Sequence, residues 1–476
     1  MIPAKNRIVI IGGGIAGLVA ANEIESRIQE ENLPYTYVVL ETHNKVGGHF
    51  ETIKMDAYYL DLSTSYLDIR DRSVVDYIKK LNLEQDVEGT DSSKPDIFLY
   101  NKFYPISYPS FAGVPMRAID IFKQKVLTPE RRLGSYFRML FAFVAKSSDA
   151  ERSAIDYLYE KYGEYVTEYL IKPILWEEGY GDFSYLTVKD IQPVLLELGN
   201  PFLPCYLNKD LFEKLDDKEN LVSFTKGMQY FVEALSKPIV ENIRVNKSVS
   251  GISVYEDLLL LDFQQKEMMR AGGVIVSVSA DHLSTLFDDS VPNNRLQSVR
   301  CVALGTAIFK FHKEDIIKYP SSYGFVIPQR SEYFISKVTI LNRIWKSMND
   351  APYIYLQVQF GRKGEDRFID LNEDVIYDFL LEELKDIMGI TSKPLDQKMK
   401  RWTSSIPHDP IHYYSEVGSL EKVLLEKMPT VLLSHNGIDG YGVMHSIQEG
   451  LRMAEEIIDR MKQRDKREAS KTTTTI

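Results

Sequence analysis

The chain has 476 residues, of which 57 are basic and 68 acidic, so its formal net charge at pH 7 is −11. This balance argues against nucleic-acid binding, and the sequence has no Cys/His spacing of the zinc type. No stretch reaches the roughly 20 apolar residues of a membrane-spanning helix, and the first strand begins too near the N-terminus to leave room for a signal peptide. We expect a cytoplasmic protein with two intertwined domains, because its length exceeds what one core supports.

The two cysteines, Cys205 and Cys301, lie far apart in the sequence with apolar neighbours. This usage predicts free, buried thiols in a reducing compartment. A redox-active pair is the alternative.

The first recognisable element is an apolar strand that enters a glycine-rich turn. Residues 7–11 are followed by the spacing Gly12-x-Gly14-x-x-Gly17. In a dinucleotide site, Gly12 permits the tight turn, Gly14 lets backbone N–H groups approach a pyrophosphate, and Gly17 lets the helix pack close to the strand. An ordinary strand-to-helix turn is the alternative.

A helix and a second strand complete this unit. The helix begins at Ile15 and Ala16, so its N-terminus would face the anion. The next apolar strand, at 37–40, ends at Glu41. An acid at this position accepts a hydrogen bond from a ribose hydroxyl in dinucleotide-binding folds. The order of these elements therefore predicts a dinucleotide site.

A second glycine pair, Gly47-Gly48, follows between Lys45 and His49. It resembles the second fingerprint of the FAD-containing amine oxidase and protoporphyrinogen oxidase superfamily, whose loop contacts flavin and pyrophosphate, and which NAD dehydrogenases lack. The resemblance implies FAD. That family usually has Arg at the position of Lys45 and Arg or Lys at that of His49. We therefore expect a weaker phosphate clamp in this chain.

The segment after Leu60 also departs from the family. The family continues with an acid, a basic residue and then Gly-Pro or Gly-Gly. This chain keeps the acid as Asp61 but has Leu62 and Ser63 next, so the glycine beside the flavin is missing.

Residues 102–146 depart from the acidic average, because basic and aromatic residues alternate there with only two acidic ones. Such a stretch could line a site for an anionic aromatic substrate or rest on an anionic membrane surface. A helical subdomain with a solvated basic face is the alternative. The basic residues are Lys102, Arg117, Lys123, Lys125, Arg131, Arg132, Arg138 and Lys146.

Further matches narrow the resemblance to the porphyrinogen oxidases. Residues 179–182 read Gly-Tyr-Gly-Asp within a helical segment at 150–198, and 223–231 resembles the segment in which that family's chain returns to the FAD domain. By the same resemblance, Val249, in a strand at 245–253, contacts the adenine through its backbone.

Two elements in the region from about Arg300 to Pro410 also match these oxidases. Residues 323–328 resemble their Gly-Phe-Val strand, and Arg401-Trp402 resembles an Arg-Trp element near the end of their substrate domain. Arg401 and Arg138 are therefore candidates for holding substrate carboxylates. A simple Arg-Trp packing pair at a strand end is the alternative.

The last match is a strand that begins at Thr430, a glycine-rich loop, and a helix expected to run to Met461. In FAD enzymes of this type the positive end of that helix stabilises the negative charge of reduced flavin. The family has Gly at the position of His435 and Pro at Met444 or the next residue. The candidate cofactor contacts are Gly440, Gly442, Val443 and Met444.

These matches run in order from Arg7 to about Met461. They imply an α/β fold with a Rossmann-like FAD-binding domain of the amine oxidase/glutathione-reductase-2 type, a mixed α+β substrate domain and a helical insertion. The expected ranges are 1–90, 220–298 and 425–465 for the FAD domain, 91–219 and 299–424 for the substrate domain, about 105–195 for the helical subdomain, and 466–476 for a flexible tail.

The resemblance implies an FAD-dependent oxidase that converts a porphyrinogen, protoporphyrinogen IX or coproporphyrinogen III, to the porphyrin with oxygen as acceptor. The flavin would be the hydride acceptor, so we assign no catalytic side chain and no metal. Peripheral membrane contact and homodimer formation are compatible with it. Two alternatives are an FAD-dependent oxidase or desaturase of another substrate, and a flavin-free paralogue that acts as a scaffold. The second would explain His49, Ser63 and His435 together.

Overall fold

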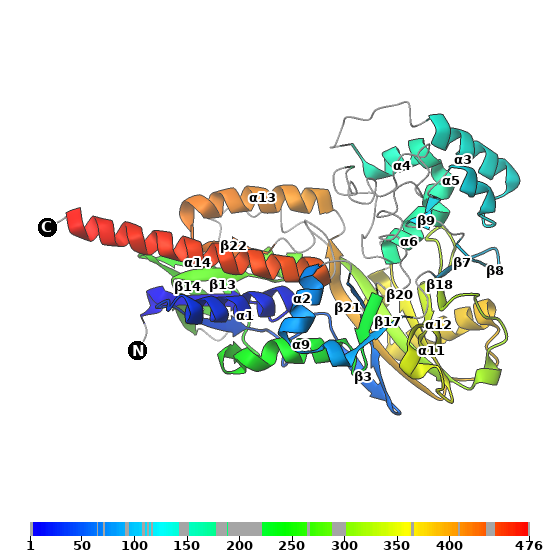
Figure 1. Ribbon diagram of the computed structural model, residues 1–476, viewed down its shortest axis with the longest axis horizontal. Helices are drawn as coiled ribbons and strands as arrows, with labels where there is room; N and C mark the ends of the chain where they lie inside the picture. Colours follow the sequence, from blue (N-terminus) through cyan, green and yellow to red (C-terminus); the bar gives the residue numbers. More distant parts are fainter. Residues whose placement is uncertain are drawn as a thin grey trace.

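The computed structural model shows two bodies side by side along the longest axis, with a group of helices above the second one (Figure 1). The structure describes residues 3–63, 65–69, 72–90, 95–106, 110–111, 114–115, 118–141, 152–177, 188, 221–263, 267–287, 301–362, 366–407, 410–434 and 443–474. Several predicted features lie outside these residues, namely Cys205, Arg117, Lys146, residues 179–182, His435, Gly440 and Gly442.

The first body is built on a parallel sheet of five strands in the order β12-β2-β1-β16-β22. Its inner strands are almost continuous apolar runs because both faces of the sheet are covered. The strands come from three separate stretches of the chain: β1 (Arg7–Ile11), β2 (Thr36–Leu40), β12 (Ile243–Arg244), β16 (Gly273–Val276) and β22 (Val431–Leu433).

Helices cover one face of this sheet. Ile8 and Ile10 of β1 pack into a core with the apolar sides of these helices, and α1 and α14 lie side by side (Figure 1). The helices are α1 (Ile15–Glu30), α2 (Arg72–Lys80), α9 (Met228–Ser236) and α14 (Val443–Thr474).

The other face packs against a small antiparallel sheet and two helices, because Val9 and Ile11 of β1 point to that side. These elements are β13 (Val249–Tyr255), β14 (Leu258–Phe263), β15 (Met268–Ala271), α10 (Ala280–Leu283) and α13 (Pro410–Lys427). The predicted α/β fold is confirmed.

Helix α14 is longer than the sequence predicted. It continues through 466–474, where we expected a flexible tail. Arg464 donates to the Gly272 carbonyl oxygen at 3.0 Å, and Glu468 pairs with Lys5 at 3.3 Å. These contacts hold the extension against the N-terminal end of the sheet.

The second body is a seven-stranded sheet in the order β21-β17-β20-β19-β18-β7-β8, in which only β18 and β7 pair in parallel. Its strands are β7 (Asp96–Leu99), β8 (Lys102–Tyr104), β17 (Cys301–Phe311), β18 (Gly324–Val326), β19 (Ile335–Ile340), β20 (Ile354–Phe360) and β21 (Asp396–Pro407). One face is covered by α12 (Glu373–Met388), whose apolar residues share a core with Val338, Leu356 and Val358.

Two separate blocks cover the opposite face. Ile97 and Val326 pack against the helical group, whereas Ile308 and Tyr355 pack against the hairpin of β3 (Thr52–Met55) and β4 (Tyr58–Asp61). The helical group consists of η3 (Ala118–Lys123), α3 (Pro129–Phe141), α4 (Ala154–Tyr162), α5 (Glu164–Val166), the π-helical turn η4 (Thr167–Ile171) and α6 (Lys172–Glu177).

Shorter elements complete the fold. They are the sheet of β5 (Leu67–Asp68), β11 (Leu221–Phe224) and β6 (Val87–Gly89), the pair β9 (Ser110–Phe111) and β10 (Val114–Pro115), and α11 (Leu341–Ile344). Among the residues that the structure describes, no helix has both the length and the apolar character needed to cross a membrane.

Candidate functional site

The two glycine-rich loops meet at the N-terminus of α1. The Gly47 N–H donates to the Gly13 carbonyl oxygen at 2.8 Å. A Cβ atom placed on Gly48 would lie 3.5 Å from the Cα atom of Gly14. The two fingerprints, about thirty residues apart in the chain, therefore form one surface.

Packing within the fold requires two of the glycines in the first loop. Gly12 has a φ of +106°, and a Cβ atom there would lie 1.9 Å from the Ser277 carbonyl oxygen. A Cβ atom on Gly17 would lie 2.1 Å from the Gly12 carbonyl oxygen. Both positions therefore exclude a side chain whether or not a ligand is bound.

Gly14 is different. Its φ of −74° and ψ of 179° suit any residue, and no described heavy atom lies within 4 Å of a Cβ atom placed on it. Nothing in the described fold thus requires a glycine at this position. The space beside it is open at the start of α1, where a ligand would approach the backbone.

That open space adjoins hydrogen-bond donors. Gly14 caps α1 without a side-chain hydrogen bond, and the first helical bond runs from the Leu18 N–H to the Gly14 carbonyl oxygen at 2.9 Å. The N–H groups of Ile15, Ala16 and Gly17 precede that bond, so they have no acceptor within the helix. Together with the positive end of the helix dipole they suit an anion such as a pyrophosphate.

Glu41, directly after β2, contacts the first glycine loop. Its side chain is buried, and its Oε2 atom accepts a hydrogen bond from the Gly13 N–H at 2.8 Å. Its Oε1 atom accepts from the His43 N–H at 2.8 Å and lies 2.8 Å from His43 Nδ1. A carboxylate can accept about four hydrogen bonds, so it retains capacity for a ribose hydroxyl.

Lys45 and His49 have protein partners in the structure. Lys45 Nζ lies 3.6 Å from an oxygen of Glu51, which also pairs with Lys400 at 2.9 Å. Burial alone would raise the pKa of Glu51, but these two cations hold it below its ordinary value. The His49 ring meets Trp402 edge-on at a centroid distance of 5.2 Å. The weakened phosphate clamp remains a prediction.

Val249 opens β13 and is buried. Its carbonyl oxygen lies 3.0 Å from His282 Nε2. The predicted backbone contact with adenine remains a prediction.

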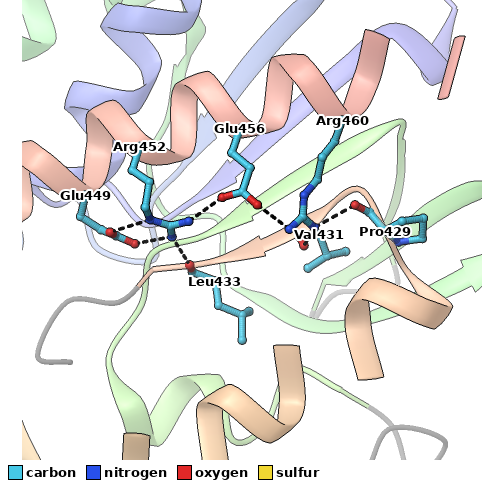
Figure 2. Close-up of polar contacts among 7 residues, drawn as sticks. All are labelled: Pro429, Val431, Leu433, Glu449, Arg452, Glu456 and Arg460. Atoms are coloured by element: carbon cyan, nitrogen blue, oxygen red, sulfur yellow. Dashed lines mark hydrogen bonds and ion pairs between the residues drawn. The ribbon is translucent and has the colours of Figure 1, made fainter. Parts of the chain in front are cut away.

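The C-terminal part of the site is held by a ladder of ion pairs on α14, drawn in Figure 2. Arg452 binds Glu449 at 2.6 Å and Glu456 at 2.6 Å, and it donates to the Leu433 carbonyl oxygen at 3.0 Å. Arg460 binds Glu456 at 2.5 Å and donates to the carbonyl oxygens of Pro429 at 2.9 Å and Val431 at 3.3 Å.

This ladder matches the edge strand β22. Arg452 and Arg460 are eight residues apart, about 12 Å along the helix, and the carbonyl groups that they bind extend from Pro429, in the turn before β22, to Leu433 at the end of the strand. The two arginines can therefore satisfy carbonyl groups at opposite ends of the strand, which would otherwise form an open sheet edge. Arg452 also fixes the last residue of β22 relative to the first turns of α14, where Val443 is buried and Met444 packs against the core.

The family model for flavin-containing amine oxidoreductases matches residues 15–458 of the chain. The chain belongs to this family. It is 22% identical over 459 residues to the coproporphyrinogen III oxidase of Bacillus subtilis, covering 94% of this chain and 97% of the relative. It is 22% identical over 500 residues to the mitochondrial protoporphyrinogen oxidase of Nicotiana tabacum, covering 96% and 95%.

Among solved structures, the chain resembles a protein of Exiguobacterium sp. 255-15 described as a protoporphyrinogen oxidase. The TM-score is 0.80 at 21% identity, with 95% of this chain and 98% of that chain covered. The resemblance to this superfamily that the sequence indicated is confirmed. The protein is a flavin-dependent oxidoreductase, and the phosphate and sugar part of a flavin nucleotide would fit the open space at Gly14, the first-turn N–H groups of α1 and the acid Glu41.

Asp61 ends strand β4 and forms hydrogen bonds with the start of α9 and with β20 of the seven-stranded sheet. It is fully buried, and its Oδ1 atom accepts from the Met228 N–H at 2.9 Å and from the Thr52 hydroxyl at 2.5 Å. Burial raises the pKa of Asp61 to about 7, although both hydrogen bonds lower it. Gln357 of β20 donates to the Asp61 carbonyl oxygen at 2.6 Å and to Ser65 Oγ at 2.7 Å.

The acid was visible in the sequence, but the other members of this network were not. Gln357 lies about three hundred residues away in the chain. Its strand carries no motif, so only the fold brings it to Asp61. The network joins the hairpin, the start of α9 and the seven-stranded sheet, and it fixes the segment that follows Asp61.

Arg401 lies elsewhere than the sequence led us to expect. Its guanidinium donates to the carbonyl oxygens of Ile369 at 2.7 Å and Leu371 at 2.8 Å, beside α12. The indole N–H of Trp402 instead points to the Leu62 carbonyl oxygen at 3.4 Å, on the hairpin side. Neighbouring residues in a strand point to opposite faces, so the pair cannot both meet a substrate. The contact of Arg401 with a substrate carboxylate remains a prediction.

The basic stretch forms helices whose cations have local partners. Arg131 stacks on the Tyr165 ring with its guanidinium carbon 3.4 Å from the centroid, and Arg132 donates to the Gln124 carbonyl oxygen at 3.0 Å. Lys123 pairs with Asp120 at 2.8 Å. Arg138 is exposed on α3. Its contact with a substrate remains a prediction.

Cys301 lies at the start of β17 and is only partly buried, so it is more accessible than the sequence suggested.

Proposed function

We propose that this flavoprotein is an FAD-dependent oxidase that dehydrogenates a porphyrinogen, either protoporphyrinogen IX or coproporphyrinogen III, to the porphyrin with oxygen as the electron acceptor. The observation that carries the proposal is the likeness to porphyrinogen oxidases over 94–96% of the chain, which includes the seven-stranded sheet as well as the flavin-binding body. A match limited to the glycine loops would support flavin binding alone.

FAD is favoured by the shape of the site. The donors at the start of α1 suit a pyrophosphate, and Glu41 at the end of β2 suits the ribose of an adenosine half. FMN has neither a pyrophosphate nor an adenosine, so it would leave both features without a role.

When bound, the flavin supplies a hydride acceptor for the substrate carbon and passes electrons to oxygen. The residues of this chain bind the cofactor and orient it. The N–H groups of α1 and the carboxylate of Glu41 hold the dinucleotide, and the start of α14 would place positive potential beside the flavin ring. Asp61 and Gln357 fix the hairpin against the sheet, so the two bodies keep one relative position across the site.

Two assays test the proposal. The nucleotide released by heating the purified protein should be FAD, and recovery of FMN or of no nucleotide from folded protein would contradict it. The protein should also generate porphyrin fluorescence from protoporphyrinogen IX or coproporphyrinogen III faster than free FAD does at equal concentration. A yellow protein that oxidises neither compound would overturn the substrate assignment but leave the family membership intact.

A cytoplasmic location, peripheral membrane contact through 102–146 and homodimer formation remain predictions from the sequence.

A further inference from the structure

A cavity of about 250 Å³ opens where the β3–β4 hairpin meets β11 and the segment that follows α11. Its rim includes the exposed residues Ala57 and Thr225, and its floor includes the buried residues Asp61, Leu341 and Trp345. The two glycine-rich loops and the acid after β2, which the structure describes in full, do not line it. The cavity is therefore a separate surface from the loops that suit a pyrophosphate. Its volume suits a small molecule, since typical ligand pockets begin at roughly 300 Å³.

Asp61 places a carboxyl group in the floor of this cavity. The residue is 6% exposed, and its Oδ1 atom accepts both side-chain hydrogen bonds, from the Thr52 hydroxyl and the Met228 N–H. Its Oδ2 atom has no hydrogen-bond partner among the residues that the structure describes. A polar atom taken out of water without a partner is costly, so such atoms usually meet a ligand or an ordered water.

The lining carries acidic and aromatic groups. Glu88 is the second acid, and it accepts hydrogen bonds from the Ser347 N–H at 3.0 Å and the Ser347 hydroxyl at 2.8 Å. The described lining contains no lysine, arginine or histidine. Tyr58 and Trp345 also line the cavity, and aromatic rings attract cations through their faces. This combination favours a cation with an apolar body and repels an anion.

The protonation of Asp61 agrees with an absent positive charge. Burial raises the pKa of Asp61 to about 7, although its two hydrogen bonds lower it. A cation beside Oδ2 would favour the ionised form. The groups that contact Asp61 from β3, α9 and β20 do not titrate; they are Thr52, Met228 and Gln357. The other titratable groups in the described lining are Glu88, Tyr58 and Tyr59.

We propose that this cavity binds a small organic ammonium ion, whose N–H groups donate to Asp61 while its apolar body lies against Tyr58 and Trp345. The ligand would occupy a second site, in addition to those for the flavin and the oxidised substrate. The inference does not depend on the proposed function, because it follows from the charge and shape of this cavity alone.

Calorimetric titration of the flavin-loaded protein with three ligands of similar shape tests the proposal. Benzylammonium, benzyl alcohol and benzoate share one ring and carry a positive charge, no charge and a negative charge. Benzylammonium should bind at least tenfold more tightly than benzyl alcohol, and benzoate should not bind. Flavin absorbance, recorded without oxygen, should stay unchanged if the amine occupies this cavity and does not react with the flavin.

The affinity for benzylammonium should also depend on pH. Around a pKa of about 7, the ionised fraction of Asp61 rises from about one tenth at pH 6 to about nine tenths at pH 8. The ligand keeps its charge over this range, so its affinity should rise about tenfold. Asp61→Asn should remove this dependence and weaken benzylammonium binding at pH 8 about tenfold to a hundredfold, with benzyl alcohol unaffected.

A second pair of variants leaves the floor of the cavity intact. Ala57→Lys adds a cation at the exposed rim and should weaken benzylammonium binding. Val254→Lys adds the same charge to β13, at a residue that is 48% exposed and does not line the cavity, so binding should stay as in the wild type. Thermal melting shows whether each variant is folded, and this pair decides the question if Asp61→Asn does not fold.

Three results would overturn the inference. They are no binding of benzylammonium at millimolar concentration, equal affinities for benzylammonium and benzyl alcohol, and binding that both Asp61→Asn and Ala57→Lys leave unchanged. The last result would place the amine elsewhere on the protein. None of them bears on porphyrinogen oxidation, which is measured separately by porphyrin fluorescence.

Discussion

Replacing Gly14 with alanine tests whether this glycine is required for folding or for ligand binding. In the folded chain a Cβ atom at Gly14 meets no described atom within 4 Å, and the backbone angles suit alanine. The free energy of unfolding of the flavin-free protein should therefore change by less than about 1 kcal/mol, the size of an ordinary glycine-to-alanine effect. In the flavin-bound protein the same methyl group would stand where the pyrophosphate approaches the backbone.

The expected loss follows from the contacts that this approach makes. Each hydrogen bond from a backbone N–H to a charged phosphate oxygen contributes about 1.5–3 kcal/mol. Loss of one such bond lowers flavin affinity about 10- to 150-fold. Titration of the flavin-free variant with FAD, followed by flavin fluorescence, measures this change.

Two further glycines provide the comparison. Gly17→Ala should destabilise the flavin-free protein by several kcal/mol, because its Cβ atom would lie 2.1 Å from a backbone oxygen. Gly418→Ala in α13 meets open space and should stabilise the helix by about 0.5–1 kcal/mol with no effect on flavin. A Gly14→Ala variant that binds flavin like the wild type, or unfolds like Gly17→Ala, would refute this reasoning.

Further substitutions test other parts of the site. Glu41→Ala removes the acceptor for two backbone N–H groups and should lower FAD affinity about 10- to 100-fold by calorimetric titration, while Glu31→Ala on the outer end of α1 should not. Asp61 keeps its proton to a higher pH in the folded protein than in the unfolded chain, so the free energy of unfolding of the wild type should fall as pH rises from about 4 to about 7. The Asp61→Asn variant should show a smaller fall over the same pH range in denaturant unfolding curves. Arg460→Gln and Arg452→Gln should both lower the melting temperature, but only Arg452→Gln, which lies nearer the start of α14, should also weaken flavin binding. If the two variants bind flavin with equal affinity, the ladder has only a structural role.

The sequence predicted the parts of the site that local backbone geometry controls. Gly12 and Gly17 are required by a turn and a helix that a few neighbouring residues define, so their spacing alone was sufficient. Short, nearly continuous apolar runs likewise indicated the strands of the parallel sheet.

Contacts between distant residues could not be predicted in this way. The direction of Arg401 depends on which face of β21 is buried, and a shift of one residue in register reverses it. The pairing of Glu51 with Lys400, and the hydrogen bond from Gln357 to Asp61, depend on how the two bodies pack.

The central claim is that this protein oxidises a porphyrinogen with a bound flavin, and a single anaerobic experiment tests it most directly. Purified protein is mixed without oxygen with coproporphyrinogen III or protoporphyrinogen IX, while flavin absorbance and porphyrin fluorescence are recorded together. We predict that the oxidised flavin band disappears as the flavin removes two electrons from the substrate, and that admitting oxygen restores the band and allows the further two-electron steps, so that porphyrin fluorescence rises only then. A flavin that stays oxidised with both compounds, while an unrelated reductant still bleaches it, would contradict the account.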